Sequence, residues 1–125
     1  MSIDDLLGPG TAAVVKARHN LETTAAQVVE MARDVKDFGP MGTEELPAAV
    51  AALESSEYVD EDEAAARWVS RAFTATPADL LTTGEAGLAF GGAMFMLRTA
   101  LHNLDNALAA LDRPGPTAPG GTFSA

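Results

Sequence analysis

The sequence predicts an all-α fold: an antiparallel helical bundle of about four helices, dominated by a long N-terminal and a long C-terminal helix. Two long segments repeat apolar residues at alternating spacings of three and four, which is the period of a helix that packs along another helix. Proline and glycine separate most of the helical segments, and no segment alternates apolar and polar residues as a strand does. These observations favour a bundle over any fold that contains a sheet.

The first long helix is predicted over residues 11–38. Gly8, Pro9 and Gly10 precede this segment, and Thr11 offers an N-cap. Neither Pro nor Gly occurs again before residue 39. The apolar stripe of this helix consists of Val14, Leu21, Ala25, Val28, Ala32 and Val35.

Two shorter helices are predicted in the middle of the chain. Thr43 is the expected N-cap of the first, and Pro47 is tolerated there because it lies in the first turn. Asp60 is the expected N-cap of the second, with Glu63 at the capping-box position. The expected apolar faces are Leu46, Val50 and Leu53 in the first helix, and Ala65, Trp68, Val69, Ala72 and Phe73 in the second.

The last long helix has the most regular pattern. Thr76, Pro77 and Asp79 predict a short capped turn before it, and Pro114 ends it. Its stripe consists of Phe90, Met94, Leu97, Leu101, Leu104, Leu108 and Leu111. We therefore expect one helical domain over residues 1–113, with a short leader at 1–10, and a flexible Pro/Gly-rich tail at 114–125.

Composition excludes several function classes. The net charge is −10, from 18 acidic against 8 basic residues, so binding to nucleic acid or to anionic lipid is not expected. There is no cysteine, and the longest apolar run is too short to span a bilayer, which takes about 20 residues. No secretory signal opens the sequence, which favours a cytoplasmic protein. No dinucleotide- or phosphate-binding motif is present, so no cofactor is expected.

Two similar quartets carry the histidines. The first is His19-Asn20-Leu21-Glu22 and the second is His102-Asn103-Leu104-Asp105. In an antiparallel pair of helices both quartets lie at a similar height, so His19, Glu22, His102 and Asp105 are candidate ligands for a divalent metal. The alternative is that they are ordinary polar residues flanking two apolar stripes.

The last helix also carries candidate interface residues, and these are Phe90, Met94, Phe95, Met96, Leu97 and Leu101. Phe95 and Met96 lie off the main stripe, which favours a second buried face or a partner surface.

No motif places a nucleophile beside a histidine, and no phosphate-binding loop is present. We therefore expect a non-enzymatic interaction or assembly protein, either a homo-oligomer or a small accessory subunit of a larger complex. One alternative is a metal-binding or redox bundle that uses the histidine quartets. A second alternative is an acidic inhibitor or mimic that binds a basic groove on another protein.

Overall fold

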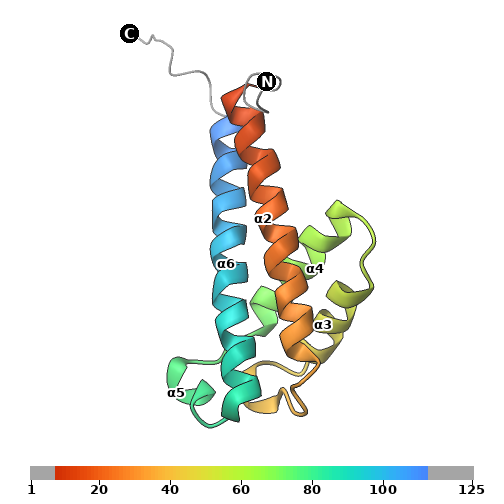
Figure 1. The fold of residues 1–125 in the computed structure, drawn as a ribbon, viewed down its shortest axis with the longest axis vertical. Coiled ribbons are helices and arrows are strands. Elements are labelled where there is room, and N and C mark those ends of the chain that lie inside the picture. The colour runs from red at the N-terminus through yellow and green to blue at the C-terminus, as the bar shows by residue number, and fades with distance from the viewer. Residues whose placement is uncertain (1–7, 113–125) are drawn as a thin grey trace.

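The computed structural model describes residues 8–112 and confirms an all-α bundle built around its first and last helices (Figure 1). Helix α2 (Pro9–Ala32) and helix α6 (Gly84–Asp112) run antiparallel and pack along most of their lengths. The elements between them are a 3₁₀ turn η1 (Gly39–Met41), helix α3 (Leu46–Ser55), helix α4 (Val59–Ala72) and the short helix α5 (Pro77–Leu80). Residues 114–125, expected to form a tail, lie outside the described residues.

Helices α3 and α4 form a second pair that packs against one side of the long hairpin (Figure 1). One core joins the two pairs. The expected stripes supply most of this core. At most 1 % of the surface is exposed in Leu21 and Val28 of α2 and in Phe90, Met94 and Leu97 of α6. Burial of such side chains is the main force that holds helices of this kind together.

A row of aromatic rings closes the core where α2 ends. Phe38 and Phe90 meet edge to face with ring centroids 5.3 Å apart, and Phe73 contacts Phe90 in the same way at 5.9 Å. Trp68 was expected in the core as well, and it packs against the core from a partly buried position.

The predicted C-terminal end of the first helix was wrong. Helix α2 ends at Ala32, six residues before Phe38, and tighter i→i+3 bonds continue the chain to Val35. Continuing the helix would carry Phe38 away from the bundle, whereas the turns return its ring to Phe90. The start also differs, because Gly8 is the N-cap and Pro9 the first helical residue, ahead of the expected cap Thr11.

Two further caps were wrong, and one was right. Helix α3 begins at Leu46 after Glu45, so Thr43 is not its cap. The Thr43 N–H instead donates to the carbonyl of Ala72, the last residue of α4, at 2.8 Å. Helix α4 begins one residue before Asp60 without a side-chain cap. At α5, Thr76 is the expected cap, and with Asp79 it forms a capping box.

Candidate interaction surface

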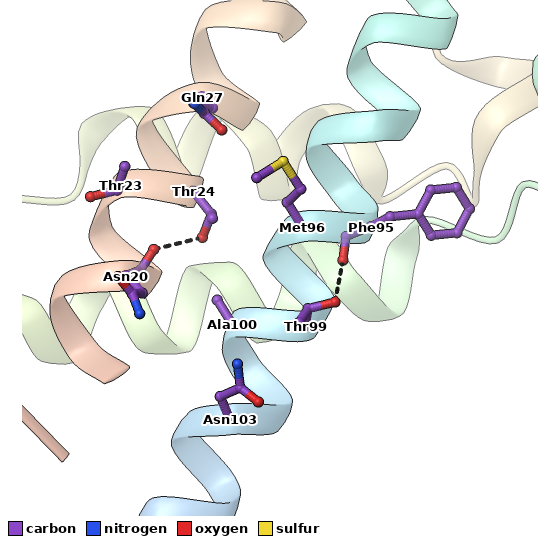
Figure 2. A pocket seen from close by; sticks show the side chains of 9 residues that line it. All are labelled: Asn20, Thr23, Thr24, Gln27, Phe95, Met96, Thr99, Ala100 and Asn103. Atoms are coloured by element: carbon purple, nitrogen blue, oxygen red, sulfur yellow. Dashed lines mark hydrogen bonds between the residues drawn. The ribbon is translucent and has the colours of Figure 1, made fainter. Parts of the chain in front are cut away.

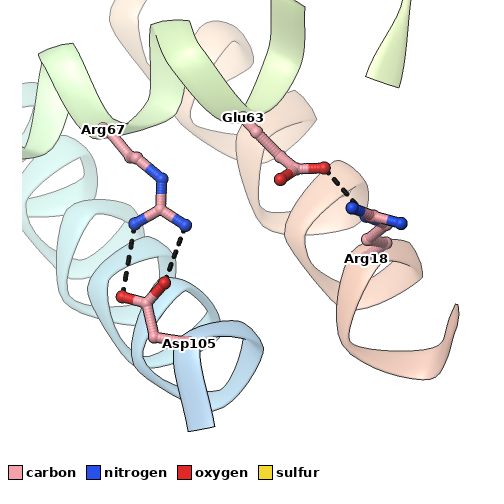
Figure 3. A network of polar contacts seen from close by, with 4 residues as sticks. All are labelled: Arg18, Glu63, Arg67 and Asp105. Atoms are coloured by element: carbon pink, nitrogen blue, oxygen red, sulfur yellow. Dashed lines mark hydrogen bonds and ion pairs between the residues drawn. The ribbon is translucent and has the colours of Figure 1, made fainter. Parts of the chain in front are cut away.

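Helix α4 is held to both long helices by ion pairs (Figure 3). Nε of Arg18 in α2 donates to Glu63 of α4 at 2.9 Å. One turn further along α4, Arg67 donates to both carboxylate oxygens of Asp105 in α6, at 2.7 and 3.2 Å. The hydrogen bond from Arg67 lowers the pKa of Asp105 below its ordinary value. Because this pair is partly exposed, it adds little stability, but it fixes which side of α6 faces α4.

Arg98 makes a second polar connection between α6 and the end of α4. Its guanidinium donates to the Ser70 carbonyl at 2.6 Å, to the Ser70 hydroxyl at 3.2 Å and to the Phe73 carbonyl. It also lies 5.1 Å from the centre of the Phe73 ring. The carbonyls at the end of a helix lack partners within the helix, and Arg98 supplies donors for those of α4.

The outward face of α6, which points away from the core and lies beside these contacts, has no formal charge. Between Glu85 and Asp112, Arg98 and Asp105 are the only Asp, Glu, Lys or Arg residues in the helix, and both turn toward α4. The outward-facing positions over about five turns form what we call the α6 stripe. Its members are all exposed: Leu88, Gly92, Phe95, Met96, Thr99, His102, Asn103 and Asn106.

A groove of about 440 Å³ runs beside this stripe, between α2 and α6, on the side away from α4 (Figure 2). It contains no Asp, Glu, Lys or Arg, and its lining residues are Asn20, Thr23, Thr24, Gln27, Phe95, Met96, Thr99, Ala100 and Asn103. Met96 points into the groove, whereas the ring of Phe95 turns away on the far side of α6. There it meets the ring of Phe73 edge to face, with centroids 6.5 Å apart. Among the described residues, the side-chain amides of Asn20, Gln27 and Asn103 have no hydrogen-bond partner, which leaves them able to bind a partner or water.

The α6 stripe and the groove together resemble the centre of a protein–protein interface. Charged residues are depleted at such centres, while Met and aromatic residues are enriched. Soluble domains carry charge at about a quarter to a third of their surface positions, so a stripe of this length without any is unusual. Leu88, Phe95 and Met96 are 44 %, 46 % and 55 % exposed, and each still has apolar area to bury.

Of the six candidate interface residues, the structure leaves two at the surface. Phe90, Met94, Leu97 and Leu101 are buried in the core of this chain, where they pack against its own helices. Phe95 and Met96 are exposed and belong to the α6 stripe. Sequence reasoning missed the neutral groove residues of α2, although the long gap between charged residues in α6 was visible in the sequence.

The four candidate metal ligands lie at a similar height but point in different directions. Asp105 turns toward Arg67 of α4, and Glu22 lies beside α3. Nε2 of His102 lies 3.2 Å from the amide nitrogen of Asn106, one turn along the same helix. Within residues 8–112 no group of three or more His, Asp or Glu side chains is placed to hold a metal ion. Metal binding by these residues stays a prediction.

Comparisons with protein-family models, with curated proteins and with solved structures found no match. Within the described residues, no helix has both the length and the apolar character needed to cross a membrane.

Proposed function

We propose that this chain is a non-enzymatic helical interaction protein, a homo-oligomer or a small accessory subunit of a larger complex, and that the α6 stripe and the adjoining groove are its binding surface. One observation carries the proposal. The charged residues of α6 between its first and last turns contact α4, and the outward-facing positions of the helix hold no Asp, Glu, Lys or Arg.

The chemistry of this surface favours a helix as the binding partner. The surface is long, nearly straight and shallow, and its anchors Leu88 and Met96 project at helical spacing. A helix laid along such a groove buries apolar side chains while neutral amides and hydroxyls at the edges adjust their hydrogen bonds. Nothing in the groove supplies a general base or a nucleophile beside one, so binding is the activity that its residues support.

Photo-cross-linking in the source organism tests the proposal. A photoreactive amino acid is placed at Thr99 in the groove and, as the matched control, at Ser55, which is exposed at the end of α3. We expect a cross-linked product of defined mass from position 99 and none from position 55. No product from position 99, or equal products from both positions, would contradict the proposal.

Two alternative functions stay predictions. A metal-binding or redox bundle requires His19, Glu22, His102 and Asp105 to bind one ion, and native mass spectrometry before and after a chelator tests for a bound metal. An acidic inhibitor or mimic requires a basic partner, for which the net charge of −10 is suited. Its association rate would fall steeply as salt is added.

A further inference from the structure

We infer that the partner of the α6 stripe is a second copy of this chain, bound antiparallel so that α6 lies against α6. This inference rests on the proposed binding surface and names its occupant. The twofold axis lies perpendicular to the helices, close to Phe95 and Met96.

The charge of the chain supports self-association through this face. Each copy carries a net charge of −10, so two copies repel one another over most of their surfaces. The α6 stripe and the groove hold no Asp, Glu, Lys or Arg, so contact through them brings no like charges face to face. The free amides of Asn20, Gln27 and Asn103 each donate and accept, so the surface can complement a copy of itself, as a twofold interface requires.

The distribution of apolar residues fixes the orientation. Leu88, Phe95 and Met96 all lie on α6, whereas α2 contributes Asn and Gln amides and Thr hydroxyls to the groove. A twofold axis parallel to the helices and centred on the groove would set apolar α6 against polar α2 of the second copy. An axis perpendicular to the helices sets α6 against α6, so apolar side chains meet apolar side chains and polar ones meet polar ones.

Residue spacing gives the register. With the axis between Phe95 and Met96, Gly92 lies opposite Thr99 of the second copy and Leu88 lies opposite its Asn103. A Cβ built on Gly92 meets no atom within 4 Å, so this position has room for the facing threonine. Helix α6 thus has open space where the opposing helix brings a side chain.

The area fits a weak dimer. An overlap of about 30 Å along the helices and a width of about 20 Å for two helices give roughly 600 Å² per copy. The pair buries about 1,200 Å² in total, at the lower limit of specific interfaces. We therefore expect a dimer that dissociates at micromolar concentration, not a permanent one.

Mass measurement and cysteine cross-linking of the full chain test the inference. Light scattering of the wild-type chain should show twice 12.9 kDa at high concentration and a fall toward 12.9 kDa on dilution. Met96→Glu places two carboxylates beside the axis and should weaken the dimer at least about 100-fold. Circular dichroism should be unchanged, because Met96 is exposed in the single chain. A wild-type chain that stays monomeric at millimolar concentration, or a Met96→Glu variant that dimerises as tightly as wild type, would overturn the inference.

Cross-linking of introduced cysteines determines the orientation. The wild-type sequence contains no cysteine, so every cross-link comes from an introduced residue. With a short bismaleimide, Met96→Cys should link into dimers, and so should the double variant Leu88→Cys/Asn103→Cys. Leu88→Cys alone and the distant control Ser55→Cys should not. Efficient linking by Leu88→Cys alone would indicate parallel helices and refute the antiparallel arrangement.

The failure of this inference is distinguishable from that of the proposed function. Photo-cross-linking from Thr99 to a product other than a doubled chain would preserve the binding surface and reject the second copy. No cross-linking from Thr99 would reject both.

Discussion

Replacing Arg98 by Met should destabilise the fold more than any other exchange of a surface charge in the described chain. The substitution keeps most of the aliphatic length and removes the guanidinium. The Ser70 and Phe73 carbonyls then lose a donor that in the structure lies at 2.6 Å from the first and in direct contact with the second. The contact with the Phe73 ring is lost with it.

The expected magnitude follows from the kind of bonds removed. A hydrogen bond to a charged group contributes about 1.5–3 kcal/mol net, and bonds that share one donor group do not add independently. Arg98 is half-buried, so water reaches part of the space left behind and the loss stays near the value for a single bond. We expect a loss of about 2–3 kcal/mol, which in a domain of this size corresponds to a fall of about 10 °C in Tm.

Urea unfolding followed by circular dichroism, at one fixed protein concentration, measures this loss. Arg71→Met is the matched control, because Arg71 is an exposed arginine in the last turn of α4, and its loss should stay within about 0.5 kcal/mol. Arg98→Lys should recover part of the stability, because an ammonium can bond one of the two carbonyls. The reasoning would be refuted if Arg98→Met unfolded at the same urea concentration as Arg71→Met.

Two further predictions concern a loop and a titration. Gly42→Ala places its Cβ 2.3 Å from the Ala72 carbonyl oxygen, so the loop that holds Gly42 must move away from the end of α4, and thermal unfolding should show a loss of about 2–4 kcal/mol. Asp105→Asn should be less stable than wild type at neutral pH by less than about 1 kcal/mol, because the ion pair with Arg67 is partly exposed. The pKa of Asp105 is lowered in the folded state, so its contribution is present above the unfolded pKa, near 3.9, and is lost as pH falls through the lower folded pKa. The difference between wild type and Asp105→Asn, measured by urea unfolding from pH 7 to pH 2, should therefore shrink below about pH 4, and a constant difference would contradict the assignment.

The architecture was predictable because helix periodicity is a local signal. The stripe of α6 could be traced from Phe90 to Leu104, and these residues are buried as expected. The capping box at Thr76 was also predictable, because both of its bonds join residues three positions apart. Helix periodicity and capping can both be predicted from a few neighbouring residues.

The features that were missed depend on contacts between distant residues. Helix α2 ends early because Phe38 packs on Phe90, which is far away in the sequence. Helix α3 begins three residues after Thr43, whose N–H bonds the distant Ala72 carbonyl. In the second histidine quartet, Asp105 turns toward Arg67 on a third helix, a contact that spacing within the quartet does not indicate. The spacing of residues along one helix does not reveal contacts with residues on other helices.

The pairing of the first described helix with the last has a consequence for synthesis. Helix α2 ends at Ala32, and about 80 further residues must be added before α6 is complete, which takes roughly 4–16 s at ordinary rates of translation. Until then the apolar side of α2 has no hairpin partner on its own chain, and α3 and α4 cover only part of it. Packing of α2 against α6 therefore waits until α6 has been synthesised, and a nascent chain halted before residue 84 exposes the unpaired apolar side of α2 to chaperones.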